Sequence, residues 1–369
     1  MMKVLLVFGT RPEAIKMCPL VLELKKHEEI DCKVCLTGQH REMLRQVMDS
    51  FGITEDYNLD IMRDKQSLTT ITADILMKLE EVLQDEKPDV VLVHGDTTTS
   101  FVAALAAFYQ KIPVGHVEAG LRTGDLYSPY PEELNRQLTG RIANYHFAPT
   151  NRNKENLAKE NICENVYITG NTVIDAFAYT VCPDYQFTIP ELNSINYATN
   201  KVVLVTAHRR ENWGGPLENI CNVILDIAKE YPNVKFVYPV HLNPIVRDTV
   251  FSMLGNTDNV ILIDPVDVMD MHNLISRSYM VMTDSGGLQE EAPAFGKPVL
   301  VMRTETERPE AVEAGTVKVV GVDRDIIFSE AKRLLDDENA YNEMAQAVNP
   351  YGDGHASERI ADILLKLKK

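Results

Sequence analysis

A glycine-containing turn followed by two carboxylates spans residues 284–291, which read Asp-Ser-Gly-Gly-Leu-Gln-Glu-Glu. The apolar run 279–282 predicts a strand before this turn, and residues 288–294 predict a helix after it. The glycines at the helix start let backbone N–H groups approach an anion, which the helix dipole also favours. Glu291 lies about one turn further on, where it can accept the hydroxyls of a ribose. The segment indicates a nucleotide diphosphate ligand, and a capped turn with a solvated glutamate is the alternative.

Basic side chains follow several other predicted strands. Arg11 and Lys16 lie near the start of the first predicted helix, where the dipole disfavours cations unless an anion is close. The His-Arg-Arg run 208–210, His241 and Arg308 also follow strands, which favours anion binding in so acidic a chain. Ordinary surface charge is the alternative. The segment after the first strand matches neither G-x-G-x-x-G nor a P-loop, which argues against nicotinamide cofactors and ATP-driven chemistry.

Three carboxylates, Asp96, Glu118 and Glu132, fall at predicted strand ends or helix starts in the first half of the chain. Each has an ordinary explanation by itself, because Asp96 can cap the following helix and Glu132 can compensate a helix dipole. Together they point to chemistry. Neighbouring carboxylates raise one another's proton affinity, so a general acid and a general base can coexist near neutral pH.

Composition bounds the class of protein. The chain has 369 residues, 45% of them hydrophobic, which is enough for two domains with full cores. Its formal net charge of -17 disfavours nucleic acid and acidic membrane surfaces as partners. No apolar stretch approaches the ~20 residues that span a bilayer, and the run 4–8 is too short for a signal peptide core. We therefore expect a cytoplasmic protein.

The six cysteines are scattered along the chain, which argues against a disulfide framework. Cys32 and Cys35 have C-x-x-C spacing, but they lie on a predicted strand, where residues three apart point to opposite faces. They cannot share a metal ion in that geometry. No histidine and carboxylate pair shows metallohydrolase spacing either, so we expect no metal site.

Strand-like runs alternate with helical patterns throughout the chain, which predicts an α/β fold with two doubly wound parallel sheets. Residues 184–200 lack periodicity and predict a loop near a domain junction. In such sheets ligands lie at the carboxyl ends of strands. The predicted strands are 4–8, 33–37, 90–94, 114–118, 145–148, 166–169, 201–206, 235–239, 260–263, 279–283, 298–302 and 317–320.

Seven segments in fixed order carry a family resemblance. They are Gly9-Thr-Arg-Pro-Glu-Ala-Ile-Lys16, His94-Gly-Asp-Thr-Thr98, Gly115-His-Val-Glu-Ala-Gly-Leu-Arg-Thr-Gly124, Gly170-Asn-Thr-Val-Ile-Asp175, His208-Arg-Arg-Glu211, Thr283-Asp-Ser-Gly-Gly287 and Glu307-Arg-Pro-Glu310. With them the chain resembles the non-hydrolysing UDP-N-acetylglucosamine 2-epimerases over almost its whole length. The resemblance implies two Rossmann-like domains in the glycosyltransferase type B architecture and a homodimer. The expected domains are 1–172 on the sugar side, completed by a C-terminal helix 356–369, and 173–355 for UDP binding.

The resemblance also implies the chemistry. Such enzymes interconvert UDP-GlcNAc and UDP-ManNAc by removing the C2 proton, expelling UDP to leave a 2-acetamidoglucal, and adding UDP back. Asp96, Glu118 and Glu132 match the acid/base residues, and His208 matches a residue that assists departure of the diphosphate. No cofactor is implied. The residues that match the UDP-binding set are Arg11, Lys16, Ser285, Gly286, Gly287, Glu291 and Arg308.

A second substrate molecule acts as an activator in some members of the family. The matching residues are Gln39, His40, Glu132, Arg209 and His241. Two other enzyme activities stay open as alternatives, a hydrolysing epimerase that releases free ManNAc and UDP and a glycosyltransferase of the same fold. A nucleotide-sugar sensor is the non-enzymatic alternative. The expected product would feed synthesis of a cell-surface polysaccharide.

Overall fold

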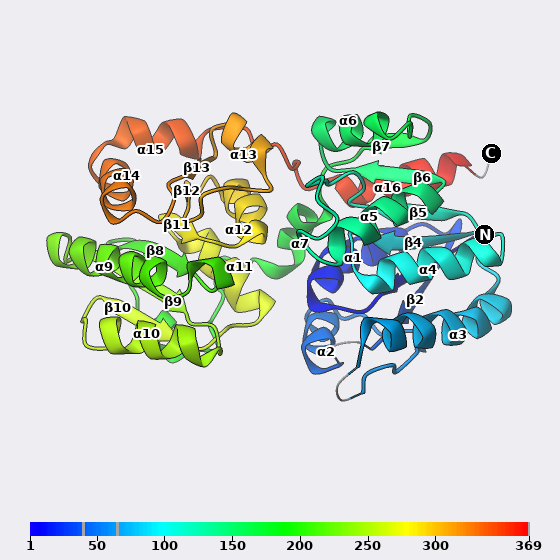
Figure 1. Cartoon of the computed structure of the whole chain (residues 1–369), viewed down its shortest axis with the longest axis horizontal. Helices are drawn as coiled ribbons and strands as arrows, with labels where there is room; N and C mark the ends of the chain where they lie inside the picture. The colour runs from blue at the N-terminus through cyan, green and yellow to red at the C-terminus, as the bar shows by residue number, and fades with distance from the viewer. Residues whose placement is uncertain (39–40, 64–65, 368–369) are drawn as a thin grey trace. The chain divides into compact units, whose positions relative to one another are not determined.

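The computed structural model describes residues 1–38, 41–63 and 66–367 (Figure 1). The chain divides into two compact units, one formed by Met1–Tyr179 with Tyr351–Lys369 and the other by Thr180–Pro350. Within the described residues, no helix combines the length and the apolar character that crossing a membrane requires.

The first unit is built on a seven-stranded parallel sheet with the order β3-β2-β1-β4-β5-β6-β7. The chain adds strands outward from β1, then returns to the other side of β1 through α3, so the order reverses between β1 and β4. The strands are β1 Met2–Phe8, β2 Ile30–Leu36, β3 Tyr57–Asn58, β4 Val90–His94, β5 Val114–Val117, β6 Tyr145–Ala148 and β7 Val166–Ile168.

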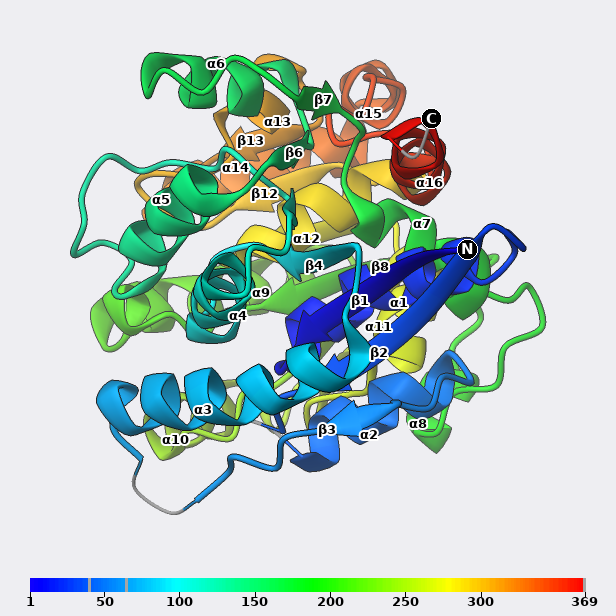
Figure 2. The same cartoon turned by 90° about the vertical axis from the view of Figure 1, so that its right-hand side faces the viewer.

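Helices cover both faces of this sheet. Figure 2 shows the ribbons of α3 and α4 next to the strands of this sheet. Apolar side chains of α3 and α4 pack on β1 and β4, and α1 packs against α2 and α16. Asp175 accepts hydrogen bonds from the backbone N–H groups of Ala356 (3.2 Å) and Ser357 (2.6 Å), which holds the start of α16 on this unit. The helices are α1 Arg11–Leu24, α2 Arg41–Ser50, α3 Leu68–Glu86, α4 Thr98–Tyr109, α5 Glu132–Ile142, α6 Asn151–Lys159, α7 Thr172–Thr180 and α16 Ala356–Leu367.

The second unit repeats this plan with a six-stranded parallel sheet in the order β10-β9-β8-β11-β12-β13, which reverses between β8 and β11. The strands are β8 Lys201–Thr206, β9 Val234–Pro239, β10 Val260–Ile263, β11 Met280–Thr283, β12 Val299–Val301 and β13 Val317–Val319. The helices are α8 Pro190–Asn193, α9 Gly215–Glu230, α10 Pro244–Leu254, α11 Val268–Arg277, α12 Gly286–Glu291, α13 Pro309–Glu313, α14 Arg324–Asp336 and α15 Glu338–Ala345, with short 3₁₀ turns η1 Arg210–Asn212 and η2 Ala292–Phe295.

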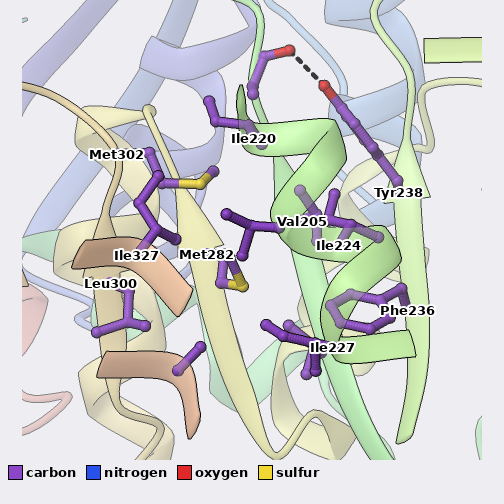
Figure 3. Packing of buried hydrophobic residues seen from close by; sticks show 14 of the residues in the cluster. Val205, Ile220, Ile224, Ile227, Phe236, Tyr238, Met282, Leu300, Met302 and Ile327 are labelled. Carbon is purple, nitrogen blue, oxygen red and sulfur yellow. Dashed lines mark hydrogen bonds between the residues drawn. The ribbon is translucent and has the colours of Figure 1, made fainter. Parts of the chain in front are cut away.

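The core of the second unit lies between its sheet and the helices α9, α10 and α14. Figure 3 shows Ile220, Ile224 and Ile227 of α9 facing the strands, and all three are fully buried. Among these apolar side chains, the hydroxyl of Tyr238 donates to the backbone carbonyl of Ala207 at 2.7 Å (Figure 3). The hydrogen bond ties the end of β9 to the loop after β8, so the core fixes a loop that carries candidate site residues.

The predicted fold class is confirmed, because both sheets are parallel and both are flanked by helices. Several boundaries differ by a few residues; β2, for example, is Ile30–Leu36, where residues 33–37 were predicted. The first helix begins at Arg11, because Thr10 and Glu13 form a capping box around its start. The region 184–200, predicted as a loop, contains the single-turn helix α8.

Candidate active site

Glu118 is a tightly held carboxylate of the first unit. It follows β5 and adopts a left-handed backbone conformation with φ of 62°, which is unfavourable for a residue with a β-carbon. Its carboxylate forms a short ion pair with the ammonium group of Lys16 and accepts a hydrogen bond from Asn171 Nδ2 at 2.9 Å. His94 Nε2 lies 3.7 Å from the same oxygen. Residues from three other segments therefore hold this strained side chain in one position.

Asp96 lies beside Glu118 at the end of the neighbouring strand. The Gly95 N–H donates to the Val117 carbonyl at 2.9 Å, so the two strand ends are in register. The capping explanation for Asp96 is wrong, since the N-cap of α4 is Thr97, whose side chain accepts from the N–H of Ser100. The Asp96 carboxylate instead pairs with the guanidinium group of Arg136 from α5.

Glu132 is the first residue of α5 and stands four residues before Arg136, so the two lie on the same helix face. Because Arg136 contacts Asp96, this face points toward the ends of β4 and β5. The next residue, Glu133, takes the structural role expected of an acidic first turn: it is fully buried and accepts from the N–H groups of Thr123 (3.0 Å) and Gly124 (3.2 Å). Glu132 itself remains half-exposed.

Glu13 is a buried carboxylate that connects the loop after β1 to the start of α4. It accepts hydrogen bonds from the N–H groups of Gly9 (3.0 Å) and Thr10 (2.8 Å) and from the hydroxyls of Thr97 (2.6 Å) and Ser100 (3.0 Å). Burial raises its pKa, although these donors act in the opposite direction. The connection positions α1, and with it the Lys16 ammonium, at the point where the strand order reverses.

Three buried histidines lie on neighbouring strands of this unit: His94 ends β4, His116 lies within β5 and His146 lies within β6. Burial lowers the pKa of His94 to about 4, of His116 to about 3 and of His146 to about 4. His116 Nε2 lies 2.7 Å from the Gly95 carbonyl oxygen and must therefore donate to it. All three imidazoles are neutral at pH 7.

Asp284 organises the candidate site of the second unit. The residue follows β11, is fully buried, and accepts from the N–H groups of His208 and Arg209, both at 2.8 Å, and from Asn212 Nδ2 at 3.0 Å. A carboxylate that accepts several N–H groups is well stabilised in its charged form. It fixes the loop after β8 against the turn after β11, across the reversal of strand order in this sheet.

His208 is the imidazole of this loop. Its Nδ1 lies 3.5 Å from Asp284 Oδ1, and its ring stacks on that of His241 with centroids 5.3 Å apart. Burial lowers the pKa of His208, while the charge of Asp284 raises it and His241 and Arg209 lower it further. His208 is thus held on one face by a second ring and on one edge by a carboxylate.

Two guanidinium groups flank the glycine turn. A β-carbon added at Gly286 would lie 3.8 Å from Arg308 Nη2 and 3.9 Å from Arg209 Nη2, so both cations stand next to this glycine. The nearest carboxylate of Arg308 is Glu290, to which its Nε donates. The contact of Arg209 with a carboxylate is longer, since its Nη1 lies 3.9 Å from Glu307 Oε1. Two cations beside a turn without side-chain bulk suit a diphosphate.

The other residues of the turn lie as their spacing predicted. Ser285 is the N-cap of α12, and Glu291 lies one turn later with Oε1 3.1 Å from the position of a β-carbon at Gly287. Glu291 Oε2 is 3.9 Å from Nε2 of the buried His272, and His272 Nδ1 is 2.8 Å from the hydroxyl of Thr180. Sequence reasoning did not find His272, because nothing in its position on α11 distinguishes it from a core residue.

Comparison with known proteins supplies the family. The family model described as UDP-N-acetylglucosamine 2-epimerase matches residues 22–365. The chain belongs to the UDP-N-acetylglucosamine 2-epimerase family. This match confirms the resemblance to UDP-N-acetylglucosamine 2-epimerases.

Relatives in this family resemble the chain from end to end. The UDP-N-acetylglucosamine 2-epimerase of Bacillus subtilis is 56% identical over 365 residues, which cover 99% of this chain and 95% of the relative. That of Escherichia coli K12 is 56% identical, with 98% of each chain covered. The crystal structure of the Neisseria meningitidis UDP-GlcNAc 2-epimerase bound to UDP-GlcNAc superposes with a TM-score of 0.89 at 53% identity, covering 99% of this chain and 100% of the other. These matches also support the type B architecture.

Within each unit, the structure brings together residues that the family resemblance had selected. Asp96, Glu118 and Lys16 gather in the first unit, with Glu132 on the helix face that carries Arg136, and His208, Arg209, His241, Gly286 and Arg308 gather in the second. Arg11 is the first residue of α1 and is half-buried. Gln39 and His40 lie outside the described residues.

The residues that sequence reasoning missed are the supports of the site. Arg136, Asn171 and Asp284 hold the candidate groups; Asn171 and Asp284 lie within the segments that carry the family resemblance, whereas Arg136 lies in none of them. Over the described ranges, no group of three or more histidine, cysteine or acidic side chains has the arrangement of a metal site. Cys32 and Cys35 are buried free thiols on β2.

Proposed function

We propose that this chain catalyses the reversible C2 epimerisation of UDP-GlcNAc to UDP-ManNAc without releasing free sugar. The observation that carries the proposal is that Asp96 and Glu118 lie at adjacent strand ends, each next to a buried or half-buried cation. Relatives of the same family bind UDP-GlcNAc, as in the Neisseria meningitidis complex.

The chemical problem is removal of a weakly acidic proton. One carboxylate among Asp96, Glu118 and Glu132 takes the C2 proton, and the C2–H electron pair forms a C1=C2 double bond as the C1–O bond breaks. The electron pair of the C1–O bond leaves with the UDP oxygen. Return of UDP to C1, with a proton delivered to the opposite face of C2, gives the epimer. The overall reaction consumes no redox cofactor, since no atom changes oxidation state between the two UDP-sugars.

Departure of UDP requires stabilisation of negative charge that develops on the diphosphate. Arg308 and the backbone of Ser285, Gly286 and Gly287 supply donors at the turn, and Arg11 and Lys16 add cations from the first unit. His208 assists departure, and Glu291 accepts the ribose hydroxyls. Positive charge placed where the leaving group forms its charge lowers the barrier without tightening ground-state binding equally.

Finer features of the proposal follow the family. We propose a cytoplasmic homodimer that supplies UDP-ManNAc for a cell-surface polysaccharide, with domains divided as the sequence predicts. A second substrate molecule would activate it through Arg209, His241 and Glu132, together with Gln39 and His40. The stacking of His208 on His241 supports a link between the reacting and activating positions.

Proton NMR of the reaction in heavy water tests the proposal. The expected result is deuterium at C2 of intact UDP-sugars that equilibrate between two epimers. Accumulating free UDP with free ManNAc would instead establish hydrolysis, and transfer to an added acceptor without C2 exchange would establish a glycosyltransferase.

Amide variants test the assigned residues. Asp96→Asn, Glu118→Gln and Glu132→Gln should each slow C2 exchange by on the order of a hundredfold or more. Glu155→Gln, at an exposed position on α6, is the matched control and should exchange at the parent rate. Parent-like turnover in all three amide variants would rule out this acid/base assignment.

A further inference from the structure

A cavity lies in the second unit, at the opposite end of the strands from the glycine turn. It has a volume of about 420 Å³, and its lining includes Lys201, Tyr279 and Lys297. Lys201 is the first residue of β8, Tyr279 directly precedes β11, and Lys297 stands two residues before β12. The cavity therefore opens at the amino ends of the strands, whereas Asp284 and Gly286 follow a carboxyl end. It is a separate place on the same sheet.

The charge of this cavity is opposite to that of the protein. Lys201, Arg277 and Lys297 line it, and no aspartate or glutamate does. Across the described residues, none of these three cations lies within 4.0 Å of a carboxylate. The whole chain has 54 acidic and 37 basic residues, so three cations without a carboxylate partner around one cavity need a reason.

Neutral groups hold two of these cations without cancelling their charge. Lys201 Nζ donates to the Leu335 carbonyl oxygen at 2.8 Å and lies 4.4 Å from the ring centroid of Tyr279. Arg277 Nη2 donates to the carbonyl oxygen of Tyr185 at 2.9 Å, and its Cζ lies 4.9 Å from the ring centroid of Phe187. Carbonyls and aromatic faces orient a cation but leave it able to attract an anion.

Lys297 has no such partner for its ammonium group among the described residues; only its backbone N–H is bonded, to the Ala292 carbonyl oxygen at 3.2 Å. The residue is half-buried, and this burial lowers its pKa. A partly buried cation without a counter-ion destabilises the protein that carries it. An external anion in the cavity would remove that cost.

We propose that this cavity is a binding site for a small phosphate-bearing anion, held chiefly by Lys297, Lys201 and Arg277. A phosphate group carries close to two negative charges, which matches three cations better than a single carboxylate does. The ring of Tyr279 stacks on that of Tyr341 at 4.2 Å and gives the cavity an aromatic wall for the remainder of such a molecule. The site is independent of the nucleotide sugar and of the reaction proposed above.

Titration of the full-length protein with inorganic phosphate, at ionic strength held constant with chloride, tests the proposal. Isothermal calorimetry should detect two sites, one lost in Arg308→Met and the other in Lys297→Met. The expected loss of affinity at the second site in Lys297→Met is roughly tenfold or more, since a charged hydrogen-bond partner is removed. Lys229→Met, at an exposed lysine of α9, is the matched control and should bind like the parent.

Thermal unfolding gives a second measurement that a merely structural lysine would not reproduce. Without phosphate, Lys297→Met should unfold at the same temperature as the parent or higher, because an uncompensated charge is gone. With phosphate, the parent should gain stability from this site and the variant should lose that gain. Equal phosphate affinity in Lys297→Met and Lys229→Met would overturn the proposal, as would an Arg308→Met variant that binds no phosphate at all.

Discussion

His116 couples the stability of the first unit to pH. Its Nε2 donates to the Gly95 carbonyl, so only Nδ1 can take a second proton, and that atom is buried without a partner. Burial lowers the pKa of His116 to about 3, from 6.5 in an unfolded chain. Above pH 6.5 the imidazole is neutral in both states and does not affect folding. Below it the unfolded chain binds a proton that the folded chain does not, so stability falls as pH falls.

The size of the effect follows from this shift. Integrating the difference in proton binding gives a loss of about 2 kcal/mol at pH 5, with a slope of about 1.3 kcal/mol per pH unit between pH 4 and 6. Other groups titrate in this range, and buried Glu13, whose pKa is raised, acts in the opposite sense. The comparison of the parent with His116→Gln cancels them. Glutamine retains a donor for the Gly95 carbonyl but has no titrating nitrogen.

Urea denaturation at a series of pH values measures this difference. The slope of unfolding free energy against pH should be smaller in His116→Gln than in the parent by about 1.3 kcal/mol per pH unit, which corresponds to about one bound proton. Phe147→Leu is the control, because Phe147 is fully buried on β6 and its truncation lowers stability without removing a titrating group. Identical slopes in the parent and in His116→Gln between pH 4.5 and 6 would refute the reasoning. Titration of the His116 ring by NMR gives the folded-state pKa directly.

Three further predictions concern backbone strain, packing and charge. Glu118→Gly should be more stable than Glu118→Ala by about 1 kcal/mol in urea denaturation, since both lose the Lys16 contact but only alanine keeps a β-carbon at positive φ; equal stabilities would contradict the strain. Gly120→Ala should lose about 3 kcal/mol or more by the same assay, because its β-carbon would lie 2.2 Å from the Asn153 carbonyl oxygen, and a parent-like midpoint would be inconsistent with this packing. Arg308→Met should weaken UDP binding by calorimetry at least about tenfold, and an unchanged Kd, as expected of Arg324→Met at the exposed start of α14, would exclude a role in the UDP site.

The periodicity of the sequence was sufficient to predict the two sheets, because parallel strands buried on both faces are continuous apolar runs. It was not sufficient for β3, which has only two residues, or for the start of α1, which a capping interaction between Thr10 and Glu13 decides. Asp96 illustrates the limit at the site. Its position after a strand was predictable, but whether it caps a helix or pairs with Arg136 depends on the placement of α5, which lies 40 residues later in the chain.

The family resemblance selected the candidate residues, and the structure shows what supports them. Asn171 lies in a segment that carries the resemblance and Arg136 does not, but the partner of neither residue can be predicted, because a lone amide or guanidinium group has many possible partners. Their roles follow only from the fold, which brings Asn171 to Glu118 across 53 residues of sequence. Long-range supports of this kind are invisible to local patterns.

Asp284 has a consequence for how an anion would meet this protein. Its carboxylate accepts hydrogen bonds from the backbone N–H groups of His208 and Arg209. These contacts form when the chain folds, so folding itself overcomes the mutual repulsion of Arg209 and Arg308. A diphosphate that approaches the protein then meets these two cations already in place, on a molecule of net charge -17. Salt would screen both the long-range repulsion of the anion by the net charge and its short-range attraction to the two cations. The association rate of the anion therefore reports the balance between these two effects.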